Sequence, residues 1–439
     1  MMRGSESYFR MDYVLIGVVA ILVLIGCLMI YSGGFDPIEK VNSGLYKRQI
    51  VWFIAGFILM LAAAFINYQQ LGDYAHYIYL AVLLILLLTT LFGSEVRNIR
   101  AWLNFGIFSI QPSEFMKLSV VILLGKLLEL RERDLSRFRE LLLPSVIMLV
   151  PVFIILKQPD FGTAIVFIPI LFTMLFVGGA DVSHLVSIIL IAVIGLVLPM
   201  ALTYSEWVGD ANTSVLLNFF NDIRRLLVVA GILFAIATVF FLLNHIYRKK
   251  YMRKIYIPCT ILSMGLFCSI LIQNFFQDYQ KKRILVFLNP DLDPQGSGYH
   301  IIQSKIAVGS GGFLGKGFLQ GSQSQLGYLP EITSDFVFSV VAEEWGFIGS
   351  MVLLGLIGFV LYRGIQTSIG AKDKFGALLA SGITAILFFH VLINIGMVIG
   401  IMPVTGLPLC FVSYGGSNLL MCMISIGILI NIRSRRHIH

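Results

Sequence analysis

Long, continuous apolar segments dominate this sequence, and they constrain its fold more than any other feature. Each segment approaches the roughly 20 residues that a helix needs to cross a bilayer. About twelve of them can be drawn, approximately at 13–32, 50–67, 74–92, 112–130, 141–156, 162–179, 183–204, 225–244, 255–276, 336–362, 376–401 and 409–431. A helix pairs all of its backbone groups within one segment, and these runs lack the alternation of barrel strands. The sequence therefore predicts an all-α polytopic membrane protein with about twelve transmembrane helices.

The amino-acid composition excludes most other classes of protein. Of the 439 residues, 58% are hydrophobic and 13% are charged, whereas average soluble chains carry roughly 25% charged residues. Soluble enzymes, nucleic-acid binders and disordered proteins are therefore excluded. The five cysteines fall within apolar segments. We expect them to be small buried hydrophobes and to form neither a disulfide framework nor a metal site.

The distribution of basic residues predicts the orientation in the membrane. With the N-terminus inside, Lys and Arg are more numerous in the cytoplasmic segments than in the outside loops. The net charge of +8 then reflects cytoplasmic basic residues near anionic lipid. The first apolar segment is long for a signal peptide and lacks an Ala-x-Ala cleavage site, so we expect it to be a retained span. We predict that both termini are cytoplasmic and that 1–439 is one integral membrane domain.

One predicted outside loop, 277–335, is rich in glycine, amide and charged residues, and structureless loops of this length are usually functional. Its glycines indicate either turns or a backbone that approaches a ligand closely. They match neither the Walker A nor the G-x-G-x-x-G spacing, which disfavours a nucleotide site. Asp293 lies in a stiff turn between two prolines, where either a turn-capping or a catalytic carboxylate fits. The cluster of Lys281, Lys282 and Arg283 indicates either an interfacial anchor or a clamp for an anionic headgroup or pyrophosphate.

Several ionisable residues fall inside the predicted spans, where a charge is costly. Glu114 and Lys117 share one helix face. They indicate either a mutually neutralising pair or the polar lining of a substrate cavity. Glu343 and Glu344 point about 100° apart on a helix, so at least one of them needs a protein partner. His390 is expected to be a satisfied packing residue and not a ligand.

Five stretches of the sequence together resemble the SEDS family (shape, elongation, division and sporulation). They follow the family's order at 102–117 (WLNFGIFSIQPSEFMK), 157–164 (KQPDFGTA), 289–317, 329–349 and 408–420 (PLCFVSYGGSNLL). The sequence QSKIAVGSGGFLGKG, followed by GSQSQLGYLPE, is more similar to the rod-shape branch, RodA, than to the division branch, FtsW. Further candidate cavity residues lie in these stretches, namely Lys157, Asp160, Lys305, Lys316, Ser413 and Tyr414. Asp160 is also expected to cap the helix that starts near Gly162.

The resemblance implies a peptidoglycan glycosyltransferase of the bacterial inner membrane that polymerises lipid II for cell elongation and shape. It also implies a class B penicillin-binding transpeptidase as partner, with lipid II and membrane lipids as ligands and no nucleic acid. Asp293 falls on the family's essential loop aspartate, which makes catalysis the favoured interpretation. Glu114 and Lys117 fall on the paired charges that line the family's cavity. No cofactor is required, although Mg or Mn is compatible with the chemistry.

The sequence departs from the family in two places. Thr333, Ser334 and Asp335 stand where the family has His-Thr-Asp, so no histidine serves as acid or base at that position. The family has ten spans, so two of the predicted helices are additional. We predict that they form an inserted helical pair within 205–276, directly before the extracytoplasmic catalytic loop 277–335.

The implied reaction joins two lipid-linked sugars. One offers a hydroxyl nucleophile, and the other carries a polyprenyl pyrophosphate leaving group, so no nucleotide is needed. We predict that Asp293 is the general base for the acceptor hydroxyl, and that basic groups or a divalent cation stabilise the pyrophosphate. Two alternatives remain. One is a lipid II flippase with Glu114 and Lys117 on its polar path, and the other is a non-catalytic scaffold that activates a transpeptidase.

Overall fold

Membrane-spanning helices make up most of the structure. The computed structural model describes residues 11–36, 41–96, 99–106, 108–130, 135, 138–208, 222–275, 286–287, 289–290, 293, 296–329 and 331–437. Among these residues, eleven helices are long and apolar enough to cross a membrane, and each overlaps one predicted segment. The remaining predicted segment, 112–130, is also a helix, but its Glu and Lys side chains make it more charged than the others. The all-α polytopic membrane class is confirmed.

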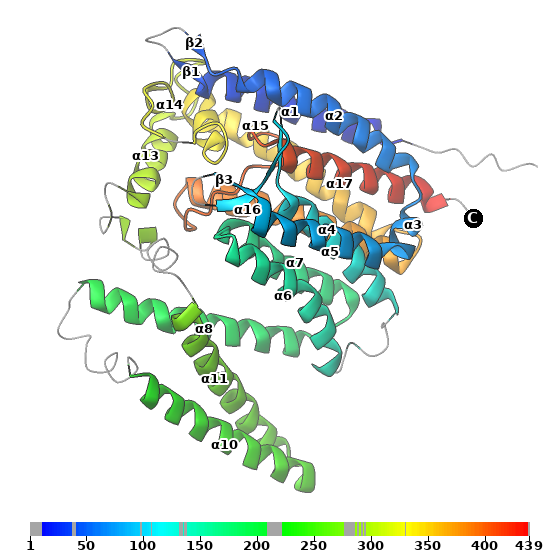
Figure 1. Ribbon diagram of the computed structural model, residues 1–439, viewed down its shortest axis with the longest axis vertical. Helices are drawn as coiled ribbons and strands as arrows, with labels where there is room; N and C mark the ends of the chain where they lie inside the picture. The colour runs from blue at the N-terminus through cyan, green and yellow to red at the C-terminus, as the bar shows by residue number, and fades with distance from the viewer. Residues whose placement is uncertain are drawn as a thin grey trace, which may run out of the picture. The chain divides into compact units, whose positions relative to one another are not determined.

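The described elements have the following bounds. The helices (Figure 1) are α1 Tyr13–Gly33, α2 Leu45–Phe65, α3 Tyr68–Asp73, α4 Ala75–Phe92, α5 Pro112–Leu130, α6 Leu142–Lys157, α7 Phe161–Gly178, α8 Val182–Val208, α10 Ile223–Tyr247, α11 Lys250–Phe275, α13 Ser297–Ser310, α14 Ser322–Gln325, α15 Val337–Ile369, α16 Lys374–Val398 and α17 Gly416–Ser434. Short 3-10 turns are Phe138–Leu141 and Arg435–His437. The strands are β1 Phe35–Asp36, β2 Val41–Asn42, β3 Ser94–Val96, β4 Ile99–Asn104 and β5 Ser109–Ile110.

The strands form two small antiparallel sheets that the sequence does not predict. β1 pairs with β2, and β4 lies between β3 and β5. The strands are two to six residues long, and most of them are therefore too short to display the alternation by which a strand is recognised.

Aspartate side chains cap several helices at their amino ends. Asp160 accepts a hydrogen bond of 3.0 Å from the backbone N–H of Thr163, which confirms the predicted cap. Asp12 and Asp373 do the same for α1 and α16. A carboxylate at this position satisfies a free N–H group and interacts favourably with the helix dipole.

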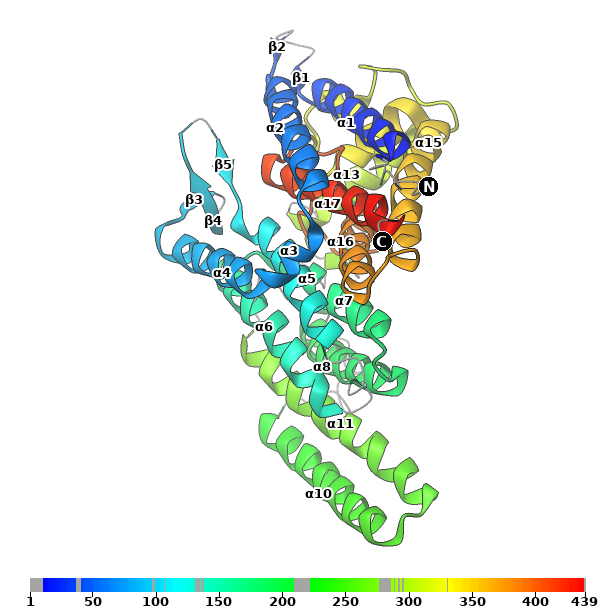
Figure 2. The same ribbon diagram turned by 90° about the vertical axis from the view of Figure 1, so that its right-hand side faces the viewer.

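The described chain divides into two compact units, 1–180 together with 299–439, and 181–298. In the first unit, α16 and α17 form the centre, because 72% and 83% of their spans are buried. Helix α16 contacts α5, α7 and α15, and α17 contacts α2 and α5 (Figure 2). Asp12, before α1, lies 3.3 Å from Arg433 in the last turn of α17, so the two ends of the described chain meet.

The second unit contains α8, α10 and α11. Helix α11 contacts both α8 and α10, and the hydroxyl of Ser263 donates a hydrogen bond of 2.8 Å to the carbonyl of Ala230 across the α10–α11 pair. These two helices lie within 205–276, where an inserted pair is predicted. That they are an insertion stays a prediction.

The predicted outside loop 277–335 contains two helices that the sequence did not predict. It contains α13 and α14. Ile301, Ser304 and Ala307 on α13 are buried at a spacing of three residues, and the Ser304 hydroxyl donates a 2.7 Å hydrogen bond to the carbonyl of Val398 in α16. The surrounding glycine and amide residues conceal this helical period in the sequence.

Candidate functional site

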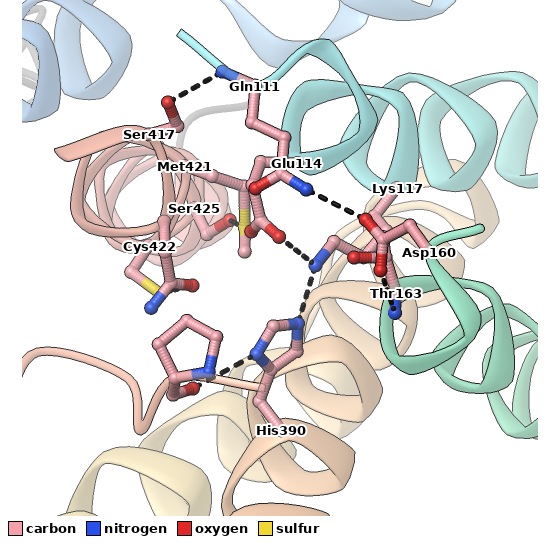
Figure 3. A network of polar contacts seen from close by, with 12 residues as sticks. Gln111, Glu114, Lys117, Asp160, Thr163, His390, Ser417, Met421, Cys422 and Ser425 are labelled. Carbon is pink, nitrogen blue, oxygen red and sulfur yellow. Dashed lines mark hydrogen bonds and ion pairs between the residues drawn. The ribbon is translucent and has the colours of Figure 1, made fainter. Parts of the chain in front are cut away.

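A buried lysine joins two spans in the first unit. The Lys117 Nζ atom lies 2.8 Å from Oε1 of Glu114 and 2.6 Å from Nε2 of His390 in α16 (Figure 3). Both side chains of the ion pair are almost fully buried, at 0% and 3% exposure. Because an ammonium group only donates hydrogen bonds, Nε2 of His390 accepts the one from Lys117, and the ring proton is then on Nδ1. This Nδ1 atom lies 3.4 Å from the carbonyl oxygen of Pro408. His390 is therefore a partner of the charge pair, which goes beyond the predicted packing role.

A second set of contacts connects the starts of three helices. Gln111 donates through Nε2 to the Asp160 carboxylate at 2.8 Å, and its backbone N–H donates to the Ser417 hydroxyl at 2.9 Å (Figure 3). The other Asp160 oxygen caps α7 through Thr163. The beginnings of α5, which carries Glu114 and Lys117, and of α7 and α17 are thus held together.

Ser413 and Tyr414 lie in the segment between α16 and α17. The Ser413 hydroxyl accepts a 2.8 Å hydrogen bond from the backbone N–H of Leu409, and its carbonyl accepts one of 3.0 Å from the Gln49 side chain. The backbone N–H of Tyr414 donates to the carbonyl of Thr333 at 2.9 Å. Ser413 is buried and Tyr414 is half-buried. The main contacts of both residues hold this segment in place.

The three candidate lysines have different surroundings. Lys157 is exposed and lies 4.8 Å from the ring centre of Phe153. Lys305 is exposed on α13. Lys316 is partly buried, and its Nζ lies 2.7 Å from the Glu343 carboxylate. Lys157 and Lys305 therefore present charge at the surface, whereas Lys316 neutralises a buried acid.

Asp293 belongs to the second unit, 181–298. Its N–H donates to the carbonyl of Pro290, and its carbonyl accepts from the N–H groups of Gly296 and Gly298, each at 3.2 Å. A Cβ atom at Gly296 would overlap the Asp293 carboxylate, so a larger residue there would displace this side chain. The side chain is half-buried. The turn thus fixes the backbone that carries this carboxylate.

The structure groups only part of the predicted site. Glu114, Lys117 and Asp160 lie on α5 and at the start of α7, which contact each other, whereas Asp293 belongs to the other unit. The basic cluster 281–283 lies outside the described residues. Within the described part of the chain, no three or more His, Cys, Asp or Glu side chains are arranged to hold a metal ion.

Some polar residues of the site were missed from the sequence. Gln111 is one, and the buried Asn394 is another. The Asn394 side chain donates to the carbonyls of Asp335 and Leu407 at 2.8 and 2.6 Å. The sequence does contain a signal by which Asn394 could have been found. His390 and Asn394 lie four residues apart in an otherwise apolar span and so share one helix face.

Gly162 permits a close contact beside Asp160, and its replacement by alanine is expected to destabilise the protein. A Cβ atom there would overlap the carbonyl oxygen of Thr405, and overpacking of this kind costs about 1–3 kcal/mol. Gly355→Ala is the matched control, since nothing lies within 4 Å of a Cβ at that helical position. Thermal unfolding of the purified proteins measures the difference. Equal stability of the two variants would contradict the predicted contact.

Known proteins are similar to this chain over nearly its whole length. The sequence model of the cell cycle proteins FtsW, RodA and SpoVE matches residues 12–223 and 230–438. Peptidoglycan glycosyltransferase RodA of Treponema pallidum (strain Nichols) is 36% identical over 446 residues, which cover 99% of each chain. Peptidoglycan glycosyltransferase MrdB of Escherichia coli (strain K12) is 32% identical, over 97% of this chain and 94% of that protein.

Solved structures are similar as well. One is a peptidoglycan synthase complex in which polymerization and crosslinking are coordinated, with a TM-score of 0.68, 28% identity, and coverage of 98% of this chain and 100% of that chain. Another is the rod shape determining protein RodA of Thermus thermophilus, with a TM-score of 0.60, 26% identity and 98% coverage of both chains. The chain therefore belongs to the SEDS family of cell cycle proteins, which includes FtsW, RodA and SpoVE, and within it is RodA-like.

Proposed function

We propose that this chain is a peptidoglycan glycosyltransferase that polymerises lipid II into glycan strands for cell elongation and shape. The observation that carries the proposal is the full-length likeness to relatives named peptidoglycan glycosyltransferase. The buried Glu114–Lys117–His390 cluster supports it. A polar group at bilayer depth is expensive, and well-packed apolar side chains often hold helices together as well as a buried ion pair does, so a functional role for the cluster is favoured.

The reaction assigns Asp293 as the general base. An acceptor hydroxyl gives its proton to this carboxylate and attacks the anomeric carbon of the donor sugar, while the polyprenyl pyrophosphate leaves with its bonding electrons. Hydrogen bonds through the Asp293 backbone fix the turn, and with it the position of the backbone that carries the carboxylate. Lys281, Lys282 and Arg283 are proposed to stabilise the departing pyrophosphate. A divalent cation is an alternative source of that charge.

The buried ion pair is proposed to contact the sugar–peptide headgroup. Oε2 of Glu114 is buried and has no hydrogen-bond partner among the described residues. A hydroxyl or amide of the substrate would satisfy this acceptor, since the carboxylate has a second oxygen beyond the one paired with Lys117. Lys157, Lys305, Lys316, Ser413 and Tyr414 are proposed to lie along the same substrate path.

The partner is proposed to be a class B penicillin-binding transpeptidase. The similar synthase complex, in which polymerization and crosslinking are coordinated, supports this pairing. The multi-pass helices are proposed to lie in the bacterial inner membrane with both termini in the cytoplasm. This orientation puts the loop that carries Asp293 outside, on the side where the glycan strand is built.

Polymerisation of fluorescent lipid II by the purified protein tests the proposal. Reactions with and without the transpeptidase partner, and with the partner alone, are resolved by strand length. Labelled strands that require this chain are the expected result. If no condition yields strands, the glycosyltransferase assignment fails, and lipid II translocation in vesicles then tests the flippase alternative.

A further inference from the structure

Helix α15 is broken at Gly346, and a loop fills the break. Gly346 has φ 65° and ψ −160°, so the surrounding backbone groups lose intrahelical partners. Segment 312–317 supplies replacements. Four hydrogen bonds of 3.0–3.2 Å run from the N–H groups of Lys316, Gly317, Phe347 and Ile348 to the carbonyls of Glu343, Glu344, Gly312 and Phe313 respectively. The loop and the broken helix thus supply hydrogen-bond partners for each other's backbone groups.

Two glycines make this close approach sterically feasible. A Cβ atom at Gly311 would overlap the carbonyl of Ala342, and one at Gly315 would overlap the carbonyl of Glu344. Gly315 also has a φ of 82°, a conformation that glycine adopts without strain. From the sequence, the loop glycines indicate either turns or a backbone that approaches a ligand closely. At Gly311 and Gly315 the backbone approaches helix α15 closely.

The Glu343 carboxylate organises the chain that follows this contact. Its side chain is fully buried. It accepts four hydrogen bonds of 2.7–3.2 Å, from Nζ of Lys316, the hydroxyl of Ser322, and the backbone N–H groups of Gln323 and Ser324. All of the donors come from one stretch, 316–324. A single acid on α15 therefore fixes a complete turn of the loop, including the start of α14.

The neighbouring Glu344 ties the same turn to α1. It accepts a hydrogen bond from the hydroxyl of Ser32, and the Gln325 side chain donates to the Ser32 hydroxyl and carbonyl at 3.2 and 3.1 Å. Helix α14 contacts both α1 and α15. We call Glu343, Glu344 and the residues they hold, 316–325 and Ser32, the double-glutamate clasp. Both glutamates have protein partners. This confirms the expectation that at least one of the two needs such a partner.

The clasp follows Asp293 along the chain, and helix α13 connects the two. Asp293 precedes α13 and accepts hydrogen bonds from the N–H groups of Gly296 and Gly298. The contact with α15 begins at Gly311, directly after α13 ends. Buried acids of this kind seldom add stability over apolar residues, so their presence calls for another role.

We propose that Glu343 is a positioning residue for glycosyl transfer. It fixes the turn 316–325, and with it the carboxyl end of the helix that follows Asp293. This inference rests on the proposed function, because it concerns the catalytic loop of that reaction.

The Glu343→Gln variant tests the proposal by two independent measurements. A neutral glutamine offers one acceptor oxygen, and its NH2 group faces donors, so the turn loosens. The kcat for lipid II polymerisation is expected to fall roughly 10- to 100-fold, because a shift of a reacting group by about 1 Å can slow a reaction by this much. The KM for lipid II is expected to stay unchanged. Hydrogen exchange of the 316–325 amides is expected to accelerate, with no change in α16 or α17.

Three further variants separate positioning from charge neutrality and from general stability. In the double variant Lys316→Met, Glu343→Gln, both charges are absent, but the one oxygen of the glutamine replaces two, so the N–H groups of Gln323 and Ser324 lose one of their two acceptor oxygens and kcat is expected to stay low. Asp12→Asn is the matched control. It changes another buried carboxylate, which lies 3.3 Å from Arg433, and is expected to retain kcat. Glu343→Asp keeps the charge with a shorter reach and is expected to give intermediate kcat and exchange.

Several outcomes would overturn the proposal. They are wild-type kcat in Glu343→Gln, unchanged exchange in 316–325, or recovery of kcat in the double variant. If Glu343→Gln does not fold, Glu343→Asp carries the same test. If the wild-type protein makes no polymer, the proposed function fails, while the exchange measurement still decides whether Glu343 holds the turn.

Discussion

Asp293→Asn is expected to lower polymerisation of lipid II by the purified protein roughly 100- to 10,000-fold, the usual contribution of a general base. The amide has nearly the shape of the carboxylate, but it does not take a proton from the acceptor hydroxyl. The backbone N–H and carbonyl of Asp293 hydrogen-bond within the turn, and the substitution leaves these bonds unchanged. Folding and binding of the transpeptidase are therefore expected to persist.

The matched control for this variant is Asp222→Asn. Asp222 is also an acid of the second unit, where it caps α10 and lies 3.4 Å from Arg225 at the surface. Its loss is expected to leave polymerisation within about twofold of wild type, because exposed ion pairs contribute little. Strand length and yield from fluorescent lipid II are compared for the three proteins. Normal strands from Asp293→Asn would remove Asp293 from catalysis and favour a scaffold or flippase.

Lys117→Met is expected to destabilise the protein by about 3–5 kcal/mol, the cost of leaving one member of a buried ion pair without its partner. Glu114 is 3% exposed, so its charge would remain in a medium that solvates it poorly. His390 would lose its donor at the same time. Thermal unfolding in lipid nanodiscs, followed by circular dichroism, measures the loss.

The same helix supplies a matched control for this second prediction. Lys126 and Glu129 have the same spacing in α5 and a distance of 2.9 Å, but they are 34% and 28% exposed. Lys126→Met is expected to cost only about 0–1 kcal/mol. The double variant Glu114→Gln, Lys117→Met removes both buried charges and is expected to recover part of the stability. Similar losses from Lys117→Met and Lys126→Met would refute the importance of burial.

Much of the secondary structure could be predicted from the sequence. Each long apolar segment is a helix, and even the charged segment 112–130 is helical, as its apolar residues indicate. The Asp160 cap and the Glu114–Lys117 pair are also local, since partners three residues apart meet on one helical turn. The sequence did not predict α13, whose buried Ile301, Ser304 and Ala307 are flanked by glycine and amide residues typical of loops.

The sequence by itself determined the membrane fold class, the positions of the spans and the family. Each span must pair its own backbone and present apolar side chains to lipid, and both requirements are met within one segment. Only the tertiary structure decided that Lys117 meets His390 and that Glu343 holds the turn 316–325. These contacts depend on the rotation and depth of each helix. Spans that are apolar on all sides carry little periodic signal for either quantity.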